Sequence, residues 1–181
     1  MNNRTLTYNV LPQQDTLLDD YFSFLTNING TMKFYEKEVY SIPTADWSEQ
    51  AINDLKVYEC PNSGKYLMNH KPLYITFRKK GGGEMDKLFK IEDIIILNFH
   101  DDYETFLKDV NYSEDYRKRV KDYVDYMLKN KIWSALPKDE KQVFMLSNKA
   151  IELKNKPKPK NGNNSFRTYY ELADLLNEDL V

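Results

Sequence analysis

The sequence predicts an α+β fold in which a mostly antiparallel, curled sheet, approaching a barrel in outline, is flanked by about three helices. Residues 71–98 carry alternating apolar and polar side chains around a glycine run, a pattern typical of a β-hairpin. Residues 113–128 carry apolar side chains at helical spacing. Aromatic residues make up 14% of the chain, which is enough for a packed core and argues against general disorder.

The elements expected before the hairpin are two helices, an extended segment and a turn. Residues 15–30 predict the first helix, which begins at a capping aspartate and ends at an Asn-Gly pair. Residues 31–42 are expected to be extended. Asp46 and Glu49 stand at capping-box spacing and predict a second, short helix. Residues 61–64, PNSG, then predict a turn.

The hairpin itself is expected to span residues 71–98. In residues 73–78, LYITFR, every second side chain is strongly apolar, so this strand should have one buried and one solvated face. Gly81, Gly82 and Gly83 supply backbone freedom at the reversal. Residues 88–97 return as the second strand.

The strongest helix signal follows an acidic connector at residues 101–109. This helix starts near Ser113, and its solvated face is expected to carry Lys118, Lys121 and Asp125, as well as the pair Asp115 and Arg119. Its buried stripe is expected to contain Tyr116, Val120, Tyr123, Val124, Met127 and Leu128.

The remaining elements are strands and a terminal helix. Residues 142–153 are expected to be strand material. A last helix is expected to start near Thr168, with Tyr169, Leu172, Ala173 and Leu176 on one face. The corresponding domain division is a single α+β domain at 1–153, a basic Pro/Asn linker at 154–165, and a C-terminal helix at 166–181 that docks on the domain.

Charge and cysteine content limit the functional classes. The chain has 26 Lys and Arg against 28 Asp and Glu, a formal charge of −2, so any electrostatic role must be local. Cys60 is the single cysteine, which excludes an intramolecular disulfide and fits a reducing compartment. Neither a signal-peptide core nor a membrane-spanning run is present in the sequence, so a cytoplasmic protein without membrane partners is expected.

Two basic segments are the candidate binding sites for a polyanion. Around the glycine run Gly81, Gly82 and Gly83 stand Arg78, Lys79, Lys80 and Lys87. Residues 149–167 carry six basic residues and one acid, 6 − 1 = +5, and the candidate contacts there are Lys156, Lys158, Lys160 and Arg167. Each segment has a plain alternative: a solvated hairpin loop with ordinary lysines, and a solubilising connector.

Catalytic and metal sites have weaker support. A metal-dependent nuclease would draw on Asp46, on residues 54–56 and on residues 139–141, which are short acid and lysine combinations that arise easily in a highly charged chain. Cys60, His70 and His100 match no zinc spacing. Tyr74, Phe77 and Phe89 are expected in the core rather than as base-stacking platforms. We therefore assign no catalytic residue, metal or cofactor.

The hairpin sequence PLYITFRKKGGGEMDKLFKIEDIII resembles a module of bacterial phage-defence and restriction-type proteins. There, a YI-x-FR strand, a glycine turn and a KI-x-x-II strand form part of a small curled β-domain that is similar to PUA-like folds. The resemblance covers residues 57–98 and, with the tail NNSFRTYYELADLL, roughly a third of the chain. It implies binding of modified bases or RNA. Because no nuclease motif matches, it transfers no catalytic residue.

The leading hypothesis is a non-enzymatic binding protein of a bacterium, phage or mobile element that acts on nucleic acid or on a nucleic-acid-processing complex. One alternative is a protein inhibitor of a defence nuclease, of the anti-restriction or anti-CRISPR type. The other is a metal-dependent nuclease. The sequence leaves the ligand, the oligomeric state and the pathway open.

Overall fold

The computed structural model describes residues 38–68, 71–80, 82–162, 167–179 and 181. All of them belong to one compact unit, residues 33–181. The helix expected at residues 15–30 and the first part of the extended segment lie outside the described residues.

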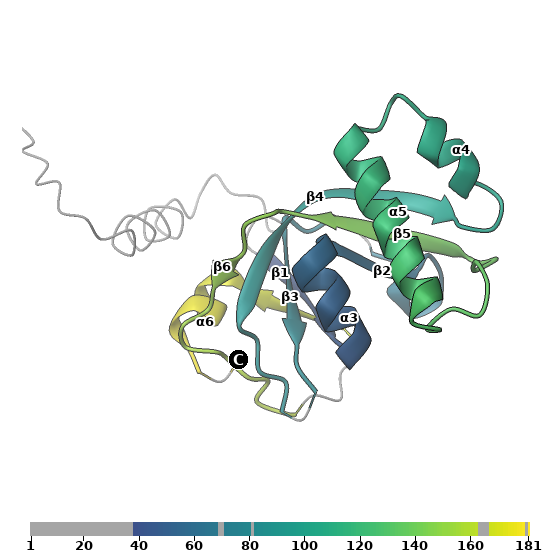
Figure 1. The fold of residues 1–181 in the computed structure, drawn as a ribbon. Helices are drawn as coiled ribbons and strands as arrows, with labels where there is room; N and C mark the ends of the chain where they lie inside the picture. The colour runs from purple at the N-terminus through teal and green to yellow at the C-terminus, as the bar shows by residue number, and fades with distance from the viewer. Residues whose placement is uncertain (1–37, 69–70, 81, 163–166, 180) are drawn as a thin grey trace, which may run out of the picture. The chain divides into compact units, whose positions relative to one another are not determined.

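A mixed sheet of seven strands runs through this unit (Figure 1). Its order is β2-β5-β4-β3-β1-β7, and β6 pairs with β4 off this path. Every pairing between the described strands is antiparallel except that of β1 with β3. The path ends at β2 and β7, so the sheet is open and the barrel outline is wrong, whereas the α+β class is confirmed. The strands are β1 (Glu38–Pro43), β2 (Val57–Pro61), β3 (Tyr74–Arg78), β4 (Lys87–Asn98), β5 (Glu140–Leu146), β6 (Ile151–Glu152) and β7 (Thr168–Glu171).

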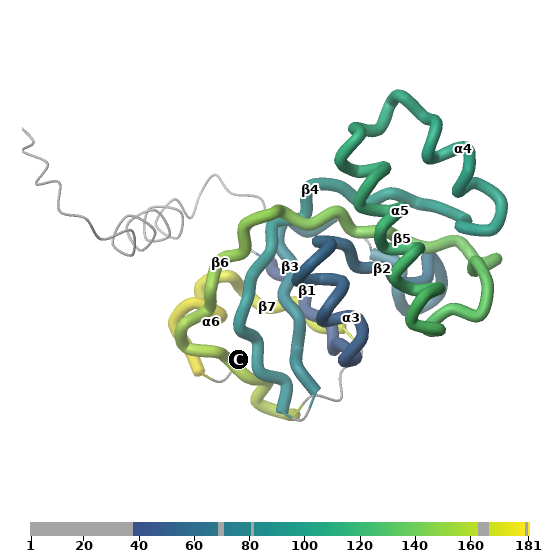
Figure 2. The backbone as a smooth tube through the Cα atoms, viewed as in Figure 1, coloured from purple at the N-terminus to yellow at the C-terminus, as the bar shows by residue number. Residues whose placement is uncertain are grey.

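Four α-helices accompany the sheet in the described part of the chain (Figure 2). They are α3 (Asp46–Gln50), α4 (Tyr103–Lys108), α5 (Glu114–Lys129) and α6 (Leu172–Asn177); α3 continues into a π-helical turn, η1 (Ala51–Leu55), and a 3-10 turn, η2 (Gly64–Tyr66), follows β2. The short helix is present, but Asp46 and Glu49 do not form the expected capping box. Ala45 is the N-cap of α3, and its N–H donates to the hydroxyl of Ser48 at 3.0 Å.

Helix α5 covers one face of β2, β4 and β5. It begins where Ser113 Oγ accepts a hydrogen bond from the N–H of Tyr116 at 3.1 Å, which satisfies a free donor of the first turn. Lys118, Lys121 and Asp125 are exposed, as predicted. Of the predicted stripe, Tyr116 is half-buried and Leu128 is 38% exposed, because both lie at its margins. The buried members are Val120, Tyr123, Val124 and Met127, which pack with Val57, Ile95, Leu97, Val143 and Met145 of the strands.

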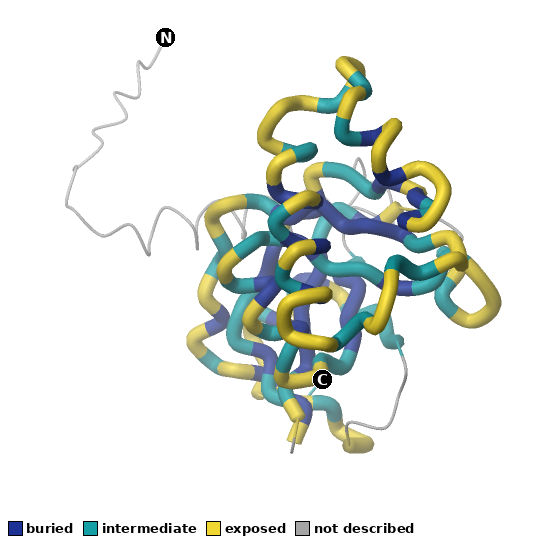
Figure 3. Tube along the Cα trace, turned by 45° about the vertical axis from the view of Figure 1, so that its right-hand side comes forward, coloured by how far each residue is buried: buried dark blue, intermediate teal, exposed yellow. Residues whose placement is uncertain are grey.

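The predicted hairpin is confirmed. Strands β3 and β4 pair antiparallel, with Ile75 opposite Phe89, and the glycine run lies in the loop between them. The expected solvated face of β3 is wrong, however, because Thr76 and Arg78 are fully buried. Ser41, on the same face of neighbouring β1, contacts buried Met85 through a hydroxyl–sulfur distance of 3.4 Å. Both faces of this part of the sheet are therefore covered, and the buried segments appear in dark blue inside the unit in Figure 3.

The C-terminal region differs from its prediction. The stretch from Thr168 to Glu171 is strand β7 rather than the start of a helix, and α6 begins at Leu172. Tyr170 lies opposite Val39, and β7 forms the outer strand next to β1. The edge of β1 supplies hydrogen-bond partners that outweigh the helical pattern, and aromatic and β-branched residues suit a strand.

Candidate nucleic-acid interface

The hairpin loop, residues 79–86, is closed by its own backbone. The N–H of Lys79 donates to the carbonyl of Glu84 at 2.9 Å, and the N–H of Gly83 donates to the carbonyl of Lys79 at 3.0 Å. Gly83 has a φ of 76°, a conformation that favours glycine. Gly82 is exposed, and a Cβ atom placed there would meet nothing within 4 Å. Gly81 lies outside the described residues. The tip is thus open to a close approach at Gly82.

The basic segment, residues 154–160, runs beside this loop although it is distant in sequence. The N–H of Met85 donates to the carbonyl of Pro157 at 3.0 Å, and the N–H of Leu153 donates to the carbonyl of Asp86 at 2.8 Å. Pro157 is buried, and the alternation places Lys156, Lys158 and Lys160 on the exposed side. The structure therefore brings the two predicted basic segments together. The division into a domain, a linker and a docking helix stays a prediction.

Arg78 does not take part in this surface. Its side chain was expected at a solvated loop, but it is fully buried, with a guanidinium nitrogen 3.5 Å from the carbonyl oxygen of Ser41. Burial lowers the pKa of this guanidinium, and the interaction with Tyr170 opposes that effect. Its position on the covered face of β3 makes it a core residue.

Lys79 and Lys87 are turned toward the protein. The ammonium of Lys79 lies 2.6 Å from a carboxylate oxygen of Asp86, and this hydrogen bond raises the pKa of Lys79. Lys87 donates to the side-chain oxygen of Asn53 at 2.9 Å. Both line a cavity of about 20 Å³ between the hairpin and α3–η1, with Phe77 among its walls. That volume holds about one water molecule, which is too small for a nucleotide or a similar ligand. Lys79 and Lys87 therefore stabilise the contact between the hairpin and α3–η1 rather than bind a ligand there.

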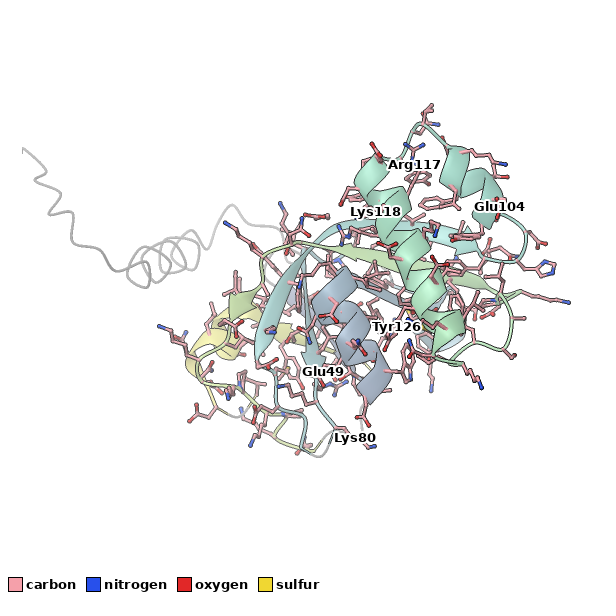
Figure 4. All side chains as sticks on the ribbon, in the orientation of Figure 1. Glu49, Lys80, Glu104, Arg117, Lys118 and Tyr126 are labelled. Atoms are coloured by element: carbon pink, nitrogen blue, oxygen red, sulfur yellow. The ribbon has the colours of Figure 1, made fainter. Side chains whose placement is uncertain are left out.

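The four remaining lysines among the predicted contacts form what we call the exposed lysine set: Lys80, Lys156, Lys158 and Lys160, with side chains 50–77% exposed. Each lies near a carboxylate. Lys80 is 3.6 Å from Asp46, and Figure 4 shows it below Glu49 at the lower end of α3. Lys156 and Lys158 each lie 3.8 Å from Glu84, and Lys160 lies 3.3 Å from Glu178. The surface at this end of the sheet is consequently of mixed charge.

Sequence reasoning missed these carboxylates. Glu84, like Asp86, the partner of Lys79, stands within the loop sequence GGGEMDK, which was a usable signal because neighbours on a tight loop share one surface. Asp46 and Glu178 come from other elements, and only the fold brings them to the lysines. The net charge of a segment is therefore a poor measure of the local potential.

Arg167 lies in a different environment from the loop. It donates to the carbonyl of Leu67, and its positive charge acts on the buried Tyr40 hydroxyl. Burial raises the pKa of Tyr40 to about 12, and Arg167 partly offsets this rise. Burial likewise raises the pKa of the Cys60 thiol to about 12, so this thiol is protonated and poorly nucleophilic at neutral pH.

The pieces of a nuclease site are not gathered into a metal site. Asp46 pairs with Lys80, Asp54 lies in η1, and Asp139 lies 3.0 Å from Lys141. In the part of the chain that the structure describes, no three His, Cys, Asp or Glu side chains are grouped to hold a metal ion. His100 lies 2.7 Å from the neighbouring Asp101, whereas His70 is outside the described residues.

The aromatic side chains weighed as base-stacking platforms lie mainly inside. Phe77 is 8% exposed and Phe89 is 1% exposed, and the two rings are in edge-to-face contact with centroids 5.9 Å apart. Tyr74 is half-buried. The expected core role is confirmed for the two phenylalanines. Across the described residues, no helix combines the length and the apolar character needed to cross a membrane.

Comparisons with known proteins add little to this geometry. No family model matches the chain, and no curated protein matches it. Two solved structures match, both of ZmASCH from Zymomonas mobilis. The first, a serine-to-alanine mutant, is 13% identical, with 62% of this chain and 69% of that chain covered and a TM-score of 0.33. The second, a tyrosine-to-phenylalanine mutant, is 14% identical, with 64% and 76% covered and a TM-score of 0.33. Similarity this weak supports no inference about the fold family or the function of this chain, and the PUA-like resemblance stays a prediction.

Proposed function

We propose that the protein is a non-enzymatic binding protein whose exposed lysine set contacts the phosphates of a nucleic acid. The supporting observation is the backbone pairing of Met85 with Pro157, which places Lys80 of the hairpin loop and Lys156 and Lys158 of the basic segment at one end of the sheet. A bacterial, phage or mobile-element origin and a cytoplasmic location are part of this proposal.

The ion pairs at this surface are weak enough to exchange. Lys80 is 77% exposed and its partner Asp46 is 82% exposed, at a separation of 3.6 Å. Exposed pairs of this kind contribute about 0–1 kcal/mol. Contact with a polyanion also releases condensed counterions, which a single carboxylate cannot offer. A nucleic acid can therefore displace the carboxylates, whereas the tightly held Lys79–Asp86 pair should stay intact.

The test is a variant in which Lys80, Lys156 and Lys158 are all replaced by Gln. Affinity for mixed-sequence duplex DNA, single-stranded DNA and RNA is measured between about 50 and 200 mM salt. If all three lysines contact phosphates, the slope of log K against log salt should become shallower by about 2.7 for a duplex and about 2.1 for single strands. Arg78 and Lys79 are left unchanged because their loss would disturb the fold.

A matched control separates position from total charge. Replacing Lys118, Lys121 and Lys129 by Gln removes the same number of positive charges from α5, which contributes no member of the exposed lysine set, and all three side chains are exposed. This control should keep the wild-type slope. Equal losses in the two triple variants would show a nonspecific charge effect, and a folded wild-type protein without affinity at low salt would end the proposal.

The mixed charge of the surface favours a second candidate, a protein partner. Every member of the exposed lysine set has a carboxylate within 4 Å, a pattern that suits a protein surface of alternating charge better than a uniform polyanion. The protein would then act as an inhibitor within a nucleic-acid-processing complex. This candidate would be supported by a stoichiometric complex with a purified defence nuclease. The lysine triple variant should weaken that complex, and the wild-type protein should have no affinity for nucleic acid.

A further inference from the structure

Glu84 bridges two members of the exposed lysine set. One carboxylate oxygen, Oε1, lies 3.8 Å from the ammonium of Lys156, and the other, Oε2, lies 3.8 Å from the ammonium of Lys158. Each oxygen thus faces a different lysine. A phosphodiester group also presents two anionic oxygens and a single negative charge, so the carboxylate stands where a bound phosphate would compete for the same two cations.

The backbone holds Glu84 at this position. Its carbonyl accepts the hydrogen bond of Lys79 that closes the loop, and the next residue, Met85, donates to Pro157 in the middle of the basic segment. The Glu84 side chain is 32% exposed, compared with 59% for Lys156 and 50% for Lys158. The carboxylate therefore belongs to the seam between the loop and the basic segment rather than to a freely moving surface side chain.

We infer that Glu84 is an internal competitor that lowers the affinity of this surface for nucleic acid, an inference that rests on the proposed function. In the free protein its carboxylate partly neutralises Lys156 and Lys158. When phosphates bind these lysines, both ion pairs are given up and the Glu84 carboxylate remains beside a polyanion, where like charges repel. Ligands with few phosphates cannot compensate for this loss, so Glu84 selects for ligands that engage several lysines at once.

The experiment is the isosteric substitution Glu84→Gln, which keeps the side-chain shape and the backbone hydrogen bond of the loop. Dissociation constants for a mixed-sequence duplex and a single strand are measured at one fixed salt concentration. The variant should bind about three- to tenfold more tightly, which corresponds to the loss of two weak surface pairs and of the repulsion. Thermal unfolding of the free variant should match the wild type.

Glu104→Gln is the matched control. It also changes the formal charge from −2 to −1, but Glu104 lies on α4, at the upper end of the view in Figure 4, while Lys80 lies at the lower end. At about 0.15 M salt, charges more than about 8 Å from the ligand are largely screened. This variant should therefore bind as the wild type does. Equal tightening in both variants would overturn the inference.

A double-mutant cycle tests whether Glu84 acts through the two lysines. In a protein that already carries Lys156→Gln and Lys158→Gln, Glu84→Gln should change the affinity less than it does in the wild type. A wild-type protein that binds while Glu84→Gln leaves its affinity unchanged would overturn this inference and leave the proposed function standing. If neither the wild type nor Glu84→Gln binds nucleic acid, the proposed function and this inference both fail.

Discussion

The guanidinium of Arg119 on α5 donates to the backbone carbonyl of Leu146, at the end of β5, over 2.7 Å. It also donates to the carbonyls of Leu55, at 3.2 Å, and Lys56. The sequence predicted only its pair with Asp115, which the structure contains at 3.3 Å. Arg119 is nevertheless 8% exposed, so a residue expected on the solvated face is a buried clamp between the helix and two chain segments.

Replacing this clamp should be costly. Arg119→Met should lower the free energy of unfolding by about 3 kcal/mol, because several carbonyls lose their donor. Arg119→Lys keeps the charge but not the planar fork, so it should recover only part of the loss. Urea unfolding measures both variants. A change within about 0.5 kcal/mol for Arg119→Met would contradict the clamp role.

The buried stripe of α5 can be tested by one core and one surface substitution. Val124 is 2% exposed, and Val124→Asp should destabilise the protein by about 3 kcal/mol or more, because it buries a charge without a partner. Lys121 is half-exposed and pairs with Asp125 on the surface, so Lys121→Ala should change stability by less than about 0.5 kcal/mol. Thermal unfolding compares the two, and similar small shifts would refute the orientation of the helix.

The hairpin loop should respond unequally at two adjacent glycines. Gly83→Ala places a side chain at a φ of 76° and should destabilise the protein by about 1–2 kcal/mol. Gly82→Ala adds a methyl group in open space and should stay within about 0.5 kcal/mol of the wild type. Chemical unfolding of both variants gives the difference, and an equal cost at the two positions would show that the loop has another conformation.

Glu59 should make stability depend on pH. Its side chain is 8% exposed, and burial raises the pKa of its carboxyl, an effect that Lys141 at 3.7 Å partly opposes. The folded state therefore binds this proton more tightly than the unfolded state, and this contribution to stability falls as pH rises from about 4.3 through the raised value. Glu59→Gln should increase stability near pH 8 by an amount of the order of 1 kcal/mol.

The pH profile distinguishes this effect from a general change of charge. The advantage of Glu59→Gln should shrink as the pH falls toward 4, where the wild-type carboxyl is protonated as well. Glu152→Gln, at an exposed position on β6, removes the same charge and should show no such profile. Denaturant unfolding at several pH values gives both curves. A pH-independent difference for Glu59→Gln would contradict the explanation by burial.

Local patterns were sufficient for the hairpin and for α5. The alternation in residues 73–78 and the glycine run depend on near neighbours along the chain, and the helical stripe of α5 repeats over several turns. The same reasoning failed at Thr168–Glu171, where a helical pattern of apolar residues lies in strand β7. That strand is decided by the free edge of β1, a partner more than a hundred residues away in sequence, which no local pattern contains.

At the candidate site, too, some features follow from the sequence and others only from the tertiary structure. The sequence alone determined which segments are rich in lysine, and that the glycine loop permits a close approach. Only the tertiary structure decided that the two segments meet, that Arg78 is buried, and that Glu84 stands between Lys156 and Lys158. The physical reason is that composition and periodicity report interactions between residues close in sequence, whereas burial and ion pairing depend on every segment that packs nearby.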